Sequence, residues 1–135
     1  MKRLSVLILS LLCAALCSCQ KADPQDLLIG TWEVSYKYTY TYGNVAETIE
    51  NSFICAFEKG GEGKIIDSSP STELHDMDDW YFTYIYNKEK NTIDFKSWSG
   101  KDNFSWIVDS LTGAYFTCHT SSDMSHATYI GRKMN

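Results

Sequence analysis

The chain has 135 residues, of which 44% are hydrophobic and 14% aromatic, and its formal net charge is −5. This length predicts one small domain, and the hydrophobic content excludes a disordered chain. The acidic balance also makes nucleic acid a poor candidate partner, because basic side chains that contact phosphates dominate that affinity.

The first eighteen residues are predicted to be a signal peptide. Lys2 and Arg3 form a basic start, and the apolar run over residues 4–16 is shorter than the ~20 residues that span a bilayer. Removal of this leader leaves 117 residues with 10 basic and 17 acidic side chains, a net charge of −7. The remaining composition is rich in tyrosine, phenylalanine and tryptophan and has only two prolines, which favours sheet over helix.

Leu16-Cys17-Ser18-Cys19 resembles the bacterial lipobox, in which a leucine lies three residues before a cysteine and a small residue lies directly before it. The resemblance implies that the sulfur of Cys19 accepts a diacylglyceryl group and that Cys19 becomes the mature N-terminus. Cys13 and Cys17 fit this pattern worse, because each follows a leucine. The alternative is a plain secretory leader that is rich in cysteine. Because two or more acyl chains anchor a protein durably, we expect an outer-membrane lipoprotein of the cell envelope, facing the periplasm or the cell surface.

Residues 19–26 are predicted to be a short tether in which Pro24 discourages helix, and residues 27–135 to be the folded domain. From Trp32 to Tyr42, apolar or aromatic residues alternate with polar ones, which is typical of a half-buried strand. Gly43-Asn44 predicts a tight turn into a second strand over about 45–57.

Six further strands are expected along the rest of the chain. They cover residues 64–67, 80–86, 92–98, about 104–108, 114–120 and about 126–134, with the longest loop at 68–78. Short connections exclude parallel neighbours, so the sheet is an antiparallel meander, and closure would remove its two long edges. The predicted fold is therefore an all-β, eight-stranded antiparallel up-and-down barrel. Its interior has room either for side chains or for one small ligand.

Gly30-Thr31-Trp32 resembles the Gly-x-Trp opening of the lipocalin fold. Together with the lipidated leader and the glycine-rich turn after Phe57, it makes residues 27–134 similar to the short lipocalin-like domains of bacterial lipoproteins. The resemblance implies that Trp32 lies at the closed end of the barrel with an arginine over its ring. We expect Arg132, the only arginine after the leader, to pack there; the alternative is an exposed cation near the chain end. The chain is several tens of residues shorter than a full-length lipocalin, which argues against a large cavity.

Cys55 and Cys118 fall on the second and seventh predicted strands, three spacings of about 4.8 Å apart around the wall. Because a disulfide needs Cα atoms within about 7 Å, two unpaired, buried thiols are expected.

His119 follows Cys118 directly, but neighbours on a strand point to opposite faces and cannot form a nucleophile–base pair. Residues 75–79 lack the pattern of a calcium loop or a zinc site, so we expect a solvated acidic loop. Neither a catalytic residue nor a metal nor a cofactor is expected.

Aromatic residues share the parity that would point into the barrel. They either fill the interior or line a small pocket near the open end, where tyrosine hydroxyls would orient a ligand. The candidate ligand-binding residues are Tyr36, Tyr38, Tyr40, Trp80, Phe82, Tyr84 and Trp106. If their face points outward instead, it forms a contact surface for a protein or glycan.

The favoured hypothesis is a lipid-anchored, non-catalytic protein that binds a small apolar or aromatic molecule. The alternative is a protein- or glycan-interaction module with a filled barrel, acting as an envelope accessory or an inhibitor. Asp109-Ser110-Leu111 also resembles an O-glycosylation sequon that some of these bacteria use on exported proteins.

Overall fold

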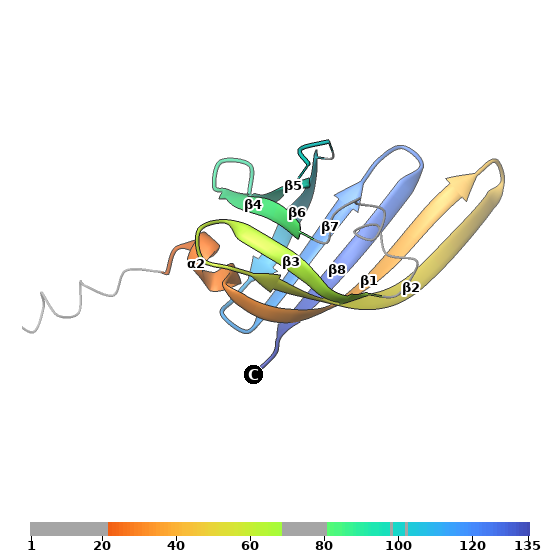
Figure 1. The fold of residues 1–135 in the computed structure, drawn as a ribbon. Helices are drawn as coiled ribbons and strands as arrows, with labels where there is room; N and C mark the ends of the chain where they lie inside the picture. The colour runs from red at the N-terminus through yellow and green to blue at the C-terminus, as the bar shows by residue number, and fades with distance from the viewer. Residues whose placement is uncertain (1–21, 69–80, 98, 102) are drawn as a thin grey trace, which may run out of the picture.

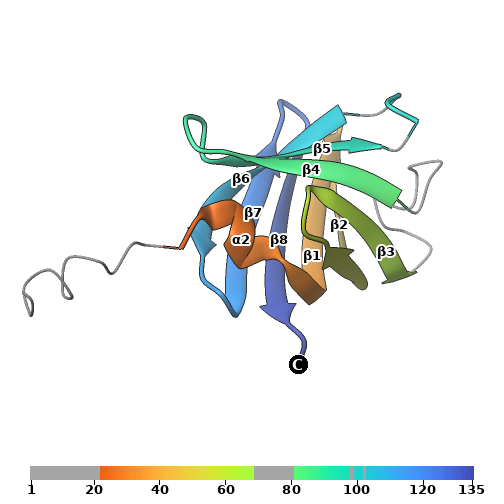
Figure 2. The same cartoon turned by 60° about the vertical axis from the view of Figure 1, so that its left-hand side comes forward.

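The computed structural model describes residues 22–68, 81–97, 99–101 and 103–135. Its eight strands pair in chain order, and β8 returns to pair with β1, which closes the barrel (Figure 1 and Figure 2). This confirms the predicted lipocalin-like antiparallel barrel. The elements are α2 (Pro24–Leu28), β1 (Gly30–Tyr42), β2 (Val45–Phe57), β3 (Glu62–Ser68), β4 (Tyr81–Asn87), β5 (Thr92–Ser97), β6 (Asn103–Leu111), β7 (Tyr115–Ser121) and β8 (Ser125–Lys133).

No helix within the described ranges combines the length and the apolar character needed to cross a bilayer.

The β1–β2 hairpin is the longest element pair of the barrel, with 13 residues in each strand. Its strands pair along their whole length and are joined by the predicted two-residue turn, where Gly43 has a φ of 61°. β3 pairs with β2 only from Phe53 onward, whereas β8 follows β1 as far as Tyr40. The end of the hairpin therefore projects past β3, as Figure 1 shows.

A short helix, and not an extended tether, leads into β1. Asp23 caps α2 by accepting a hydrogen bond from the backbone N–H of Gln25 at 3.0 Å. Pro24 occupies the first turn, where its missing N–H leaves no hydrogen bond unmade, so the prediction that it discourages helix was wrong. Asp23 also forms an ion pair with Lys88 at 3.0 Å, and the Gln25 side chain accepts from the backbone N–H of Tyr86 at 2.8 Å. The chain is thus attached to the barrel from Asp23 on.

Trp32 lies fully buried at the closed end, but the cation over its ring is not Arg132. Lys133 Nζ lies 4.9 Å from the ring centroid of Trp32. The prediction for Arg132 was wrong, and the strand pairing gives the reason. Lys133 pairs with Trp32 and shares its inward face, whereas Arg132 pairs with Glu33 and is exposed on the outer face.

Lys133 also closes the base of the barrel by hydrogen bonding. Its Nζ donates to the carbonyl oxygens of Leu27 at 3.1 Å and Ile29 at 2.8 Å. Gly30 directly follows Ile29 with a φ of 138°, and a Cβ there would be 3.1 Å from Lys133 Cε. The glycine of the Gly-x-Trp pattern therefore allows both the backbone conformation and the close approach of Lys133.

Cys55 and Cys118 are free and buried, which confirms the prediction of two unpaired core thiols. They lie on β2 and β7, which are separated by β1 and β8 in the closed barrel.

Candidate functional site: the open end of the barrel

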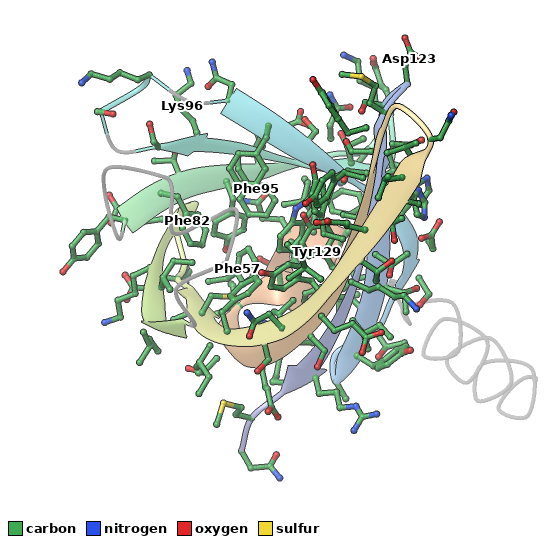
Figure 3. All side chains as sticks on the ribbon, turned by 90° about the vertical axis from the view of Figure 1, so that its right-hand side faces the viewer. Phe57, Phe82, Phe95, Lys96, Asp123 and Tyr129 are labelled. Carbon is green, nitrogen blue, oxygen red and sulfur yellow. The ribbon has the colours of Figure 1, made fainter. Side chains whose placement is uncertain are left out.

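Aromatic rings occupy the interior of the barrel. Trp106 is central among them: its ring stacks on Tyr129 at 4.3 Å and meets Phe95 edge-on at 4.7 Å. Below it, Phe57 contacts Phe82 and Tyr84 at centroid distances of 5.6 and 4.8 Å. Figure 3 shows Phe57, Phe82, Phe95 and Tyr129 converging inside the wall. Most of the inward-facing rings thus pack against one another.

The predicted ligand-binding residues separate into two groups. Tyr36, Phe82, Tyr84 and Trp106 are all buried in the core. The hydroxyl of Tyr84 donates to the carbonyl of Glu58 at 2.8 Å, at the closed end. Burial raises the pKa of Tyr84 to about 12. These four side chains are part of the packed core and are closed off from solvent.

Tyr38 and Tyr40 form the second group, and Trp80 lies outside the described residues. Both tyrosines are only partly buried, with ring centroids 5.8 Å apart. They continue the inward-facing register of β1 past the point where β3 ends. They are the predicted site residues that the structure places at the open end.

The side chains on this side of the hairpin form one continuous surface, which we call the hairpin face. Three cross-strand pairs make it up: Tyr38 with Ile49, Tyr40 with Glu47, and Tyr42 with Val45. Side chains paired across an antiparallel ladder lie about 4.5–5.5 Å apart at Cβ, so each pair is in contact range.

The hairpin face is largely apolar and exposed at its tip. Tyr42 is 83% exposed and Val45 60% exposed. Met124, in the β7–β8 turn, is 69% exposed, but only its backbone is fixed next to the hairpin, where the N–H of Thr41 donates to the carbonyl of Met124 at 2.9 Å. In Figure 3, Asp123 marks this β7–β8 turn next to the hairpin tip. An aromatic and aliphatic patch thus borders the open end.

One polar contact lies within the hairpin face. The hydroxyl of Tyr40 donates to the carboxylate of Glu47, and this hydrogen bond raises the pKa of Tyr40. The opposite side of the hairpin is polar, with Thr39 and Thr48 hydroxyls 3.1 Å apart and a Lys37–Glu50 ion pair at 3.4 Å. The two sides of the same ribbon therefore differ in chemistry, and only one offers an apolar contact surface.

Sequence reasoning placed Tyr38 and Tyr40 here but omitted Val45, Glu47 and Ile49. These three could have been found, because a two-residue turn fixes the register and puts them opposite the tyrosines.

Within the described part of the core, the buried indole N–H of Trp106 lacks a hydrogen-bond partner. A buried donor left unpaired costs about 1–3 kcal/mol relative to a satisfied one. An acceptor atom inside the barrel would satisfy it.

Hollows also occur outside the barrel wall. One of about 530 Å³ lies over β4, β5 and β6 beside Ile85, Asp94 and Ser105. Another of about 480 Å³ lies over β1, β2 and β8 beside Ser35 and Lys37. Most of the residues that line them face outward, although Tyr84, Phe95 and Phe104 also border the first hollow and Tyr36 the second; no residue of the hairpin face lines either.

The side chains that could support nucleophilic chemistry are not arranged for it. Cys118 is buried, and this burial raises the pKa of its thiol to about 12, so the thiol stays protonated near neutral pH. His119 points to the outer face and contacts Asp109 instead. Among the described residues, no group of three or more histidine, cysteine or acidic side chains is placed to hold a metal. The predicted acidic loop at 75–79 lies outside the described residues.

No protein-family model matches the chain, and no curated protein matches it either.

Ser110 of the proposed sequon is exposed on the outer wall, with its hydroxyl 3.0 Å from that of Thr117.

Proposed function

We propose that this protein is a non-catalytic interaction module of the bacterial cell envelope, anchored by lipid at Cys19, that binds a partner protein through the hairpin face. The observation that carries the proposal is the exposed apolar patch formed by Tyr42 and Val45 next to the partly buried Tyr38 and Tyr40. Tyrosine is enriched in protein interfaces, and exposed apolar patches commonly mark such sites. The aliphatic side chain of Val45 favours a protein over a glycan.

The position of the N-terminus supports this arrangement. The chain reaches the closed end at Asp23, only four residues after Cys19, which spans at most about 14 Å. β1 then runs 13 residues to the hairpin tip, roughly 40 Å away along an extended strand. A lipid at Cys19 would hold the closed end near the membrane and display the hairpin face away from it.

The anchor is tested by mass spectrometry of the mature N-terminus and by labelling cells with radioactive palmitate. We expect label on the wild-type protein and none on Cys19→Ser. Label that persists on Cys19→Ser, or a mature N-terminus elsewhere, would contradict the lipid anchor without bearing on the hairpin face.

The partner is tested by placing a photo-crosslinking amino acid at position 42 or 45 in the protein expressed in its own envelope. The matched controls are positions 41 and 46, which form the neighbouring cross-strand pair with side chains on the other side of the ribbon. We expect one defined protein adduct from positions 42 and 45. Equal adducts from all four positions, or none from 42 and 45, would refute the assignment of the hairpin face.

A second function, binding of a small aromatic molecule, is supported by Trp106 Nε1, which has no hydrogen-bond partner among the residues whose placement is described. Such a ligand would need a hydrogen-bond acceptor that reaches this donor between Tyr129 and Phe95, whose rings contact that of Trp106. Native mass spectrometry of protein purified from its host should then show a bound molecule, and Trp106→Phe should lose it. Absence of any bound molecule, together with unchanged or increased stability of Trp106→Phe, would contradict this second function.

A further inference from the structure

A histidine pair lies on the outer wall of the barrel, on the side opposite the hairpin face. His119 on β7 and His126 on β8 have ring centroids 6.1 Å apart. Both lie at positions that face away from the core, since their neighbours Cys118 and Ala127 are buried. The pair is not used by the proposed interaction site.

A β-bulge aims a carboxylate at one of these histidines. The register between β6 and β7 shifts after Val108, so Asp109 is the extra residue of the bulge. Because a bulge sets two consecutive residues against one on the partner strand, Asp109 can turn its side chain outward next to Ser110. Both carboxylate oxygens of Asp109 lie 2.9 Å from His119 Nδ1. This irregularity in the ladder thus orients the imidazole.

The contact with Asp109 also determines which ring nitrogen of His119 is free. An ionised carboxylate only accepts hydrogen bonds, so Nδ1 must carry the proton and donate it. In the neutral ring, Nε2 then holds the lone pair and is directed away from Asp109. A carboxylate behind a histidine in this way is the usual outer-shell partner of a metal-binding imidazole, because it fixes the tautomer and raises ligand basicity.

The spacing of the two rings fits one shared ion. Metal–nitrogen bonds to imidazole are about 2.0–2.1 Å, which puts two rings on one ion about 5–6 Å apart between their centroids. The observed centroid distance of 6.1 Å lies just above the upper end of this range. Imidazole ligands suit Zn²⁺, Cu²⁺ and Ni²⁺, whereas Ca²⁺ and Mg²⁺ prefer oxygen.

We propose that His119 and His126 bind a divalent transition-metal ion on the outer wall, with Asp109 as the positioning residue for His119. Since no third metal-binding side chain in the described part of the chain completes the group, the remaining coordination positions would be filled by water or by a group from a partner. The buried thiols of Cys55 and Cys118 cannot supply a ligand, because they point into the core.

The test uses the full-length protein, purified in detergent without a polyhistidine tag and titrated calorimetrically with Zn²⁺ and Cu²⁺ near neutral pH. We expect saturable binding of one ion per chain and no heat with Ca²⁺. His119→Gln and His126→Gln should each weaken binding at least tenfold, and Asp109→Asn by about 10–100-fold. His75→Gln is the matched control and should bind like the wild-type protein.

Electron paramagnetic resonance of the Cu²⁺ complex separates ligation from positioning. Two coordinated nitrogens are expected in the wild-type protein and in Asp109→Asn, but one in either histidine variant. Because both histidines are on the outer face, an unchanged unfolding midpoint shows that each variant is folded. The proposal is overturned by the absence of saturable binding, by wild-type affinity in His119→Gln or His126→Gln, or by loss of binding in His75→Gln alone.

Discussion

Gly131→Ala provides the most direct test of whether the barrel is filled. Gly131 lies on β8 with its α-carbon against the buried ring of Phe116 on β7. An added Cβ would come within 2.1–2.6 Å of three ring atoms of Phe116. Real Cβ contacts essentially never come that close, so the ring would have to move.

The ring of Phe116 has little space to move into. It is fully buried and lies against Trp32 at 4.9 Å and Trp106 at 6.1 Å, and Trp32 is itself tied to the base by a hydrogen bond. Inserting one methyl group into a packed core costs about 1–3 kcal/mol. Because the ring has little space to move, we expect Gly131→Ala to lower the free energy of unfolding by about 3 kcal/mol. For a domain of this size, that lowers the melting temperature by roughly 10 °C.

The free energy of unfolding is measured by urea denaturation followed by tryptophan fluorescence. Gly113→Ala is the matched control, because its Cβ would meet only Leu27 Cδ2 at 3.9 Å and should change stability by less than about 0.5 kcal/mol. Combining Gly131→Ala with Phe116→Leu should give a loss smaller than the sum of the single losses, by about 1 kcal/mol or more. If Gly131→Ala proves no more destabilising than Gly113→Ala, the interior has free volume, and binding of a ligand inside the barrel becomes the better hypothesis.

Three further predictions concern the closed end and the thiols. Trp32→Phe removes the indole donor that bonds a buried backbone carbonyl of α2 at 2.7 Å, so urea denaturation should show a loss of about 1–3 kcal/mol. Lys133→Met should destabilise by about 1–2 kcal/mol, since it removes the cation over Trp32, whereas Arg132→Met should cost less than about 0.5 kcal/mol; the opposite ranking would contradict the corrected assignment. Burial raises the pKa of Cys118 to about 12, above its value in the unfolded chain, so the stability it contributes is present below about pH 9 and lost as pH rises toward 12. Cys118→Ala should flatten this decline in unfolding free energy, and a thiol reagent should label Cys55 and Cys118 only after denaturation; labelling of the folded protein near neutral pH would show that the thiols are accessible.

Local patterns were sufficient for most of the fold. The alternation from Trp32 to Tyr42 identifies a strand with one buried face, and Gly43-Asn44 fixes the turn and hence the register of β2. Short connections then require an antiparallel meander, and closure follows because open edges are unfavourable. The same register could have located Val45 and Ile49 on the hairpin face.

The predictions from sequence were wrong where the position of a side chain depended on contacts between residues far apart in the chain, or on a shift of one residue in strand pairing. Lys133 rather than Arg132 covers Trp32, because the pairing of β8 with β1 decides which of two adjacent cations points inward. Pro24 begins a helix because Asp23 caps it and Gln25 bonds to β4. Neither the cap formed by Asp23 nor the hydrogen bond from β4 to Gln25 can be predicted from the composition of a short polar segment.

The sequence by itself determined the class of fold, the alternation of faces along each strand and the absence of a disulfide between Cys55 and Cys118, because these depend on period-two alternation and on strand count. Only the tertiary structure decided that most of the inward rings pack against one another, that the bulge at Asp109 meets His119, and that Lys133 covers Trp32. The physical reason is that alternation specifies the direction of a side chain, whereas the distance to its neighbours depends on barrel closure, stagger and bulges. Those features are set by hydrogen bonds between strands that are far apart in the chain.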